Sequence, residues 1–174
     1  ATPSGAKALI VAFGGGEGRG SPSGWVVAFD TAKLAAGTAP ANVWCSNPDN
    51  DAGVGFGGGV WMANAAPAID DNGDIFVADG HGGNTNARIV KFSKDGKFIK
   101  TWGKKGTAPG EFDTPHTLAM DSKGRLFVGD RANNRIQIFD QDGKFLESWT
   151  QFSRPSGLYI DKNDTLYSAD SESN

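Results

Sequence analysis

The stretch Asp113-Thr-Pro-His-Thr-Leu-Ala-Met-Asp-Ser-Lys-Gly-Arg-Leu-Phe-Val-Gly-Asp130 decides the fold expected for this 174-residue chain. It predicts two short strands, at residues 117–120 and 125–128, because both segments are mainly apolar. The residues between them, 121–124, have the composition of a tight turn. The stretch therefore predicts a strand, a turn and a second strand that ends at an acidic residue.

The same pattern occurs at residues 68–79 and again at 159–170. A second predicted hairpin follows the first two copies, at residues 88–98 and 135–145, with an offset of 47 positions (135 − 88). Units of four short antiparallel strands that repeat every 40–50 residues or so are typical of propeller blades. The sequence therefore predicts an all-β protein, a β-propeller of four-stranded antiparallel blades.

The predicted blades form one domain over residues 1–174. An irregular first blade covers 1–66, two regular blades cover 67–103 and 104–150, and a further blade starts at 151–174. Closed propellers typically have about four to eight blades. With three to four blades, the chain is expected to form a partial propeller, or a ring that a second copy completes as a homo-oligomer.

Composition argues against several classes of partner. The net charge is −3 and acidic and basic residues are interspersed, which disfavours nucleic acid and anionic membranes as partners. No apolar run approaches the roughly 20 residues that a membrane-spanning helix needs. The chain starts at Ala1 without an initiating methionine, which favours a processed, exported protein in the periplasm or outside the cell.

Residues 70–174 resemble the NHL-repeat propellers, through Pro115-His-Thr-Leu-Ala-Met-Asp, Gly124-Arg-Leu-Phe-Val-Gly-Asp and Pro155-Ser-Gly-Leu. Within that family they are most similar to the peptidyl-α-hydroxyglycine α-amidating lyases, through Gly96-Lys-Phe-Ile-Lys-Thr-Trp-Gly and Pro115-His116. The N-terminal part instead resembles a blade of the pyrroloquinoline-quinone-type propellers, through residues 24–30 and 57–70.

The lyase resemblance implies a central zinc ion held by histidines from several blades, with a small-molecule or peptide substrate. His116 is the candidate ligand, and its counterpart one blade later is Ser156. The alternative for His116 is a hydrogen-bonded histidine without a metal. His81 lies where the lyases carry a catalytic tyrosine, so it is a candidate catalytic residue. Arg131 is a candidate for recognising a substrate carboxylate, and the alternative is a salt bridge to an aspartate of a neighbouring blade.

Asp79, Asp130 and Asp170 recur at one blade position. Recurrence favours a structural role, accepting backbone N–H groups from the loop that follows. Carboxylates that converge on the channel with loop carbonyls could also bind calcium. Three functional hypotheses follow: a lyase-like enzyme, a non-enzymatic scaffold for a protein or saccharide, and a quinone-cofactor propeller.

Overall fold

The computed structural model describes residues 8–13, 25–30, 42–45, 67–80 and 86–171. In these ranges the chain forms short strands and one 3₁₀ turn, with no α-helix. The elements are β1 (Ala8–Phe13), β2 (Trp25–Asp30), β3 (Asn42–Cys45), β4 (Ala68–Ile69), β5 (Ile75–Asp79), β6 (Arg88–Phe92), β7 (Phe98–Trp102), β8 (Pro115–Met120), β9 (Leu126–Asp130), η1 (Arg131–Asn133), β10 (Arg135–Phe139), β11 (Phe145–Trp149), β12 (Pro155–Ile160) and β13 (Leu166–Asp170).

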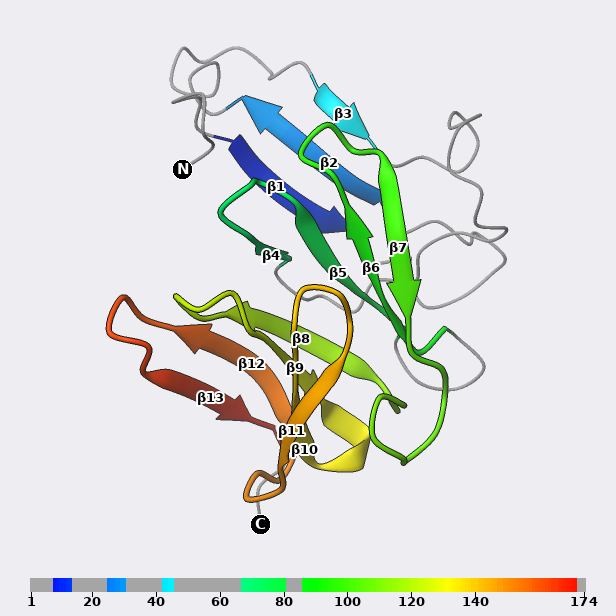
Figure 1. Cartoon of the computed structure of the whole chain (residues 1–174), viewed down its shortest axis with the longest axis vertical. Helices are drawn as coiled ribbons and strands as arrows, with labels where there is room; N and C mark the ends of the chain where they lie inside the picture. Colours follow the sequence, from blue (N-terminus) through cyan, green and yellow to red (C-terminus); the bar gives the residue numbers. More distant parts are fainter. Residues whose placement is uncertain (1–7, 14–24, 31–41, 46–66, 81–85, 172–174) are drawn as a thin grey trace.

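The strands form four antiparallel sheets that follow one another in chain order. The sheets β4–β7 and β8–β11 have four strands each, whereas β1–β3 has three and β12–β13 has two (Figure 1). Strand β8 packs against β5 of the preceding sheet and against β12 of the following one. This arrangement confirms the prediction of a propeller, with about three blades in the described part of the chain.

An aspartate starts most of the hairpin turns. Asp121 Oδ1 accepts the backbone N–H groups of Lys123 at 3.1 Å and of Arg125 at 2.8 Å. Such a side chain satisfies backbone donors that the turn itself leaves unpaired. The turns that start at Asp70, Asp140 and Asp161 repeat this pattern. The turn chemistry expected from the sequence is therefore confirmed.

The fourth residue of each turn has a left-handed backbone. Gly124 has a φ of 73°, and glycine occupies the same place in most of the other turns. The turn of β12–β13 carries Asp164 there instead, with a φ of 61°. Glycine adopts this conformation without the clash that a Cβ atom causes, so Asp164 is the strained member of the series.

Among the described residues, one apolar cluster lies between β4–β7 and β8–β11, and another lies between β8–β11 and β12–β13. The first includes Phe76, Leu118 and Phe139. The second is built from Phe127, Ile136 and Ile138, with residues of β12 and β13 packed against them. Every residue of β5 and of β9 is buried, since these strands are covered on both faces.

Strand bounds differ from the expectation at the ends nearest the candidate site. Strand β8 begins at Pro115 and β9 continues to Asp130, two residues beyond each predicted bound. Pro115 pairs with Asp130 across a β-bulge, which accommodates a residue that has no N–H group. Both extensions bring polar side chains to one end of the sheet.

Candidate functional site

His116 is held at the start of β8 by a contact to the next sheet. Its Nδ1 atom lies 2.9 Å from the carbonyl oxygen of Ser156 at the start of β12. A carbonyl oxygen only accepts hydrogen bonds, so Nδ1 is the protonated nitrogen in this contact. In the neutral ring the lone pair then belongs to Nε2, the arrangement found in metal-ligating and proton-accepting histidines.

Arg131 reaches across the same junction from the end of β9. Its Nε donates to Ser156 Oγ at 3.0 Å, and its Nη2 donates to Ser171 Oγ at 3.3 Å. The two hydroxyl oxygens are themselves 2.7 Å apart. The backbone N–H of Arg131 donates to the carbonyl of Thr114 at 3.1 Å, which fixes where the side chain starts.

His116, Arg131, Ser156 and Ser171 therefore form one polar group at the junction of two blades, which we call the entrance site. It offers a guanidinium, two hydroxyls and an imidazole. A guanidinium binds a carboxylate through two parallel hydrogen bonds, and hydroxyl groups can add further donors. The chemistry of the site suits a ligand with a carboxylate.

The sequence predicted His116 and Arg131 as site residues, whereas it gave Ser156 only as the blade counterpart of His116 and did not indicate Ser171. The signal that could have identified it is the repeat itself. Ser171 follows Arg131 by 40 positions, the same offset that relates Ser156 to His116. Each blade therefore supplies two members of the site from equivalent positions.

Asp130 immediately precedes Arg131, pairs with Pro115 across the sheet and is fully buried. It accepts hydrogen bonds from the Asp113 N–H at 2.7 Å, from Asn133 Nδ2 at 2.8 Å and from Arg135 Nε at 2.8 Å. Burial raises the pKa of Asp130, while the hydrogen bonds from Asn133, the Asp113 N–H and Arg135 act in the opposite direction. These contacts are those of a structural carboxylate.

Asp130 and Asp170 accept backbone N–H groups from the loop before the blade, so for Asp130 the expectation of donors from the loop that follows was wrong. The donor to Asp130 is Asp113 and the donor to Asp170 is Ser153, each 17 positions earlier (130 − 113 and 170 − 153). Each carboxylate thus ties the start of a blade to the end of its second strand. From the loop that follows β9, Asp130 accepts a hydrogen bond from the Asn133 side chain.

The described residues do not form a complete metal centre. No group of three or more His, Cys, Asp or Glu side chains in these ranges could hold an ion. Asp79 pairs with Arg88 and hydrogen-bonds Asn86, and Asp170 bonds Ser153 and Ser168, so each serves its own blade. His81 lies outside the described residues. Zinc and calcium stay predictions, and no chemical step is assigned to them.

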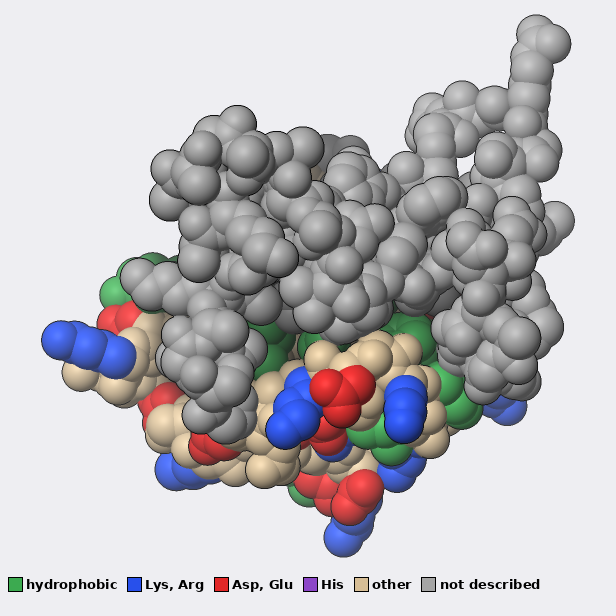
Figure 2. Space-filling view, turned by 90° about the horizontal axis from the view of Figure 1, so that it is seen from above, with side chains coloured by type: hydrophobic (Ala, Val, Ile, Leu, Met, Phe, Trp, Pro, Cys, Tyr) green, Lys and Arg blue, Asp and Glu red, His purple; other side chains and the backbone are tan. Residues whose placement is uncertain are grey.

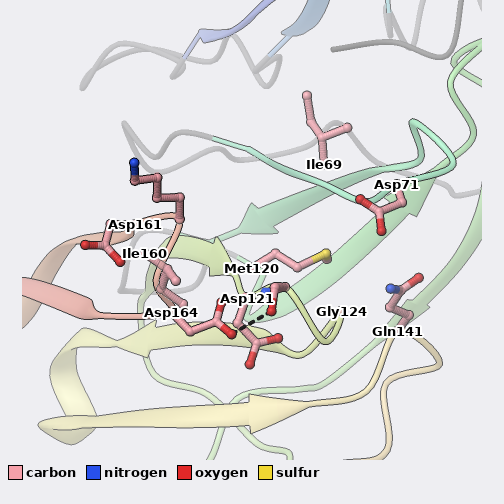
Figure 3. A pocket seen from close by; sticks show the side chains of 11 residues that line it. Ile69, Asp71, Met120, Asp121, Gly124, Gln141, Ile160, Asp161 and Asp164 are labelled. Carbon is pink, nitrogen blue, oxygen red and sulfur yellow. Dashed lines mark hydrogen bonds between the residues drawn. The ribbon is translucent and has the colours of Figure 1, made fainter.

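A pocket of about 270 Å³ lies at the ends of β4, β8 and β12, away from the entrance site at the start of β8 and β12. The turns that follow β4, β8 and β12 line it, so Asp71, Asp121 and Asp161 come from three successive sheets (Figure 3). Asp121 and Asp161 accept turn N–H groups, and Asp164 accepts the Ser122 hydroxyl at 2.6 Å. Asp121 and Asp161 thus stabilise their own turns, and Asp164 stabilises the junction between two sheets.

The surface of the described residues has mixed charge. On the face in Figure 2, Lys and Arg side chains lie beside Asp and Glu side chains. No helix in the described ranges is long and apolar enough to span a membrane.

Comparison with known proteins agrees with the propeller fold and finds sequence similarity to NHL-repeat proteins. The model of the NHL repeat matches residues 112–139. Human NHL repeat-containing protein 3 is 45% identical over 63 residues, which cover 36% of this chain and 18% of that protein. Peptidyl-alpha-hydroxyglycine alpha-amidating lyase 1 of Drosophila melanogaster is 43% identical over 61 residues, 30% of this chain and 11% of that protein. The matched segments are thus a small part of these relatives.

A solved structure supports the same fold. The catalytically inactive H270A virginiamycin B lyase from Staphylococcus aureus superposes with a TM-score of 0.55 and 14% identity, over 94% of this chain and 53% of that one. This likeness shows the β-propeller fold. The resemblance to NHL-repeat propellers expected from the sequence is confirmed, since residues 112–139 match the family model of the NHL repeat.

Proposed function

We propose that the entrance site binds the carboxylate of a small-molecule or peptide substrate, in a propeller with the activity of the amidating lyases. The observation that supports this most is the position of Arg131, whose guanidinium meets Ser156 and Ser171 of the next blade beside His116. The sequence similarity to a peptidyl-α-hydroxyglycine lyase supports the choice of substrate class.

The proposed substrate is a peptide that ends in α-hydroxyglycine, which carries a carboxylate next to a hydroxyl group. Arg131 binds the carboxylate and fixes the orientation of the terminal residue. His116 Nε2 takes the hydroxyl proton while the C–N bond breaks, and the protonated imidazole then gives that proton to the departing amide nitrogen. The products are a peptide amide and glyoxylate, so atoms and charge balance.

His116 suits this role because its other ring nitrogen is fixed. The hydrogen bond from Nδ1 to the Ser156 carbonyl orients the ring and keeps the lone pair on Nε2. The same geometry suits a metal ligand. Zinc bound there together with groups outside the described residues stays a prediction, as does export of the chain.

The experiment is to incubate the chain with a synthetic peptide that ends in α-hydroxyglycine and to measure glyoxylate release. We expect release above the uncatalysed rate, and a loss of about tenfold or more in His116→Gln, because positioned general bases contribute about 10²–10⁴-fold. Arg125→Lys is the control, since Arg125 contacts Asp121 at the other end of β9.

Release that is the same for wild type and His116→Gln would contradict the catalytic role of His116. Binding of the peptide without any release would favour the non-enzymatic scaffold. The quinone-cofactor hypothesis rests on residues that lie mostly outside the described ranges, and it stays a prediction.

A further inference from the structure

The turn between β4 and β5 contains the only Asn-Gly pair of the sequence, at Asn72 and Gly73. Asn72 is exposed, and Gly73 has a left-handed backbone with a φ of 85°. The backbone nitrogen of a glycine can attack the side-chain amide of an asparagine before it, because no Cβ atom crowds the approach. Such chemistry is one reason why asparagine is a thermolabile residue.

The side-chain amide of Asn72 is not fixed in the way that the amide of Asn133 is. Asn133 Nδ2 donates to the fully buried carboxylate of Asp130 at 2.8 Å, which holds that amide in place. The described part of the chain gives the Asn72 side chain no hydrogen bond, whereas its backbone N–H donates to Asp70 Oδ1 at 2.9 Å. The amide carbon can therefore turn toward the Gly73 nitrogen while the backbone of the turn stays in place.

The turn between β12 and β13 has the same hydrogen bonds but a different residue after its asparagine. Asn163 N donates to Asp161 Oδ1 at 2.9 Å, and Asp164 N donates to the Asp161 carbonyl at 3.0 Å. The two matching bonds of the first turn are both 2.9 Å long. Asn163 is also exposed. At the attacking residue the turns differ, since Gly73 has no side chain where Asp164 has one.

We propose that Asn72 is a site of spontaneous deamidation in the folded chain. The Gly73 nitrogen forms a bond to Asn72 Cγ, the bond from Cγ to the amide nitrogen breaks, and ammonia leaves with the proton that the Gly73 nitrogen loses. Water then opens the succinimide ring at one of its two carbonyls, which gives aspartate or isoaspartate. Before ring closure, the hydrogen bond from Gly73 N–H to the Asp70 carbonyl opens through a local fluctuation of the turn.

Both products change a turn that borders the pocket. Asp71 lines the pocket, and the residue that follows it gains a negative charge. Isoaspartate also adds one carbon to the backbone between the two N–H groups, of Asn72 and Asp74, that Asp70 Oδ1 accepts. One carboxylate oxygen then no longer reaches both groups in this turn, whereas the aspartate product keeps both bonds. The inference does not depend on the entrance site.

The test is to hold the folded full chain in mildly alkaline buffer, to digest samples at acidic pH and to follow the peptides by mass spectrometry. We expect the peptide with Asn72 to gain about 1 Da and to separate into an aspartate and an isoaspartate form. The peptide with Asn163 is the internal control. It should change more slowly by about tenfold or more, since the Asp164 side chain raises the barrier to ring closure. The same chain in urea is the positive control for the chemistry.

Asp164→Gly places an Asn-Gly pair in the equivalent turn, where the left-handed backbone suits glycine. It should raise the rate at Asn163 by about tenfold or more, to the rate at Asn72. Asn72→Gln is the negative control and should remove the mass gain from its peptide, because a longer side chain needs a larger ring.

Three results would overturn the proposal. The first is a chain that gains mass at Asn72 in urea but not in the folded state. The second is an equal rate at Asn72 and Asn163 in the folded wild type. The third is a rate at Asn163 that Asp164→Gly leaves unchanged.

Discussion

The carboxylate of Asp130 and the guanidinium of Arg135 form an ion pair of 2.8 Å in which Asp130 is fully buried and Arg135 is 12% exposed. The guanidinium also donates to the carbonyls of Thr107, Ala108 and Glu111. One arginine thus fixes both the buried carboxylate and the loop before β8. Since that loop leads into Pro115 and His116, the pair supports the geometry of the entrance site.

Arg135→Gln should lower the free energy of unfolding by about 3–5 kcal/mol, because it leaves a buried carboxylate without its partner. Chemical denaturation at neutral pH measures the loss. Lys100→Gln is the matched control, since it breaks the ion pair with exposed Asp142 and should cost less than about 1 kcal/mol. Equal losses in the two variants would contradict the structural role assigned to the buried pair.

The cost of Arg135→Gln should shrink in acid. The pKa of Asp130 is raised by burial, and removing the arginine takes away a group that opposes this rise. A raised folded-state pKa gives stability below the unfolded value of about 3.9, and that stability is lost as the pH rises through the folded value. Denaturation curves near pH 4 and pH 7 should therefore show the smaller loss at pH 4.

Gly143→Ala should be more destabilising than Gly110→Ala, although both residues have a φ close to 80°. The shared left-handed backbone costs about 1–2 kcal/mol with a Cβ atom. A Cβ at Gly143 would also lie 2.6 Å from the Trp102 ring, whereas nothing lies within 4 Å of one at Gly110. We expect about 1–3 kcal/mol more for Gly143→Ala from this overpacking. Equal costs by chemical denaturation would contradict the packing of Trp102 between the blades.

Asp164 should contribute to the loss of folding stability at acidic pH. Hydrogen bonds from Ser122 lower the pKa of Asp164. A lowered folded-state pKa gives stability above the unfolded value of about 3.9, and this stability is lost as the pH falls through the folded value. Asp164→Asn should therefore flatten the decline of the melting temperature below pH 4. Ser122→Ala, which removes the hydroxyl donor, should flatten it in the same sense, and an unchanged profile in both variants would contradict this contact.

The fold could be predicted from the sequence because its signals are local and repeated. The turn that starts at Asp121 needs only its own next four residues, and its copies in other blades agree. The backbone donor to Asp130 and the hydroxyl partners of Arg131 were not predicted, because they lie 17 or more positions away in the chain. Asp130 accepts from a residue 17 positions earlier, and Arg131 donates to hydroxyls of the next blade. Such contacts depend on how sheets stack, which no short stretch of sequence encodes.

The most direct test of the entrance site compares the dissociation constants of two peptides. One ends in a free carboxylate, and the other has the same sequence with a C-terminal amide. We predict that the wild type prefers the carboxylate, and that Arg131→Lys weakens its binding by about tenfold or more, since lysine cannot form the bidentate contact. Arg125→Lys should leave the constant unchanged. A preference for the carboxylate that survives in Arg131→Lys, or that is absent from the wild type, would contradict carboxylate recognition by Arg131.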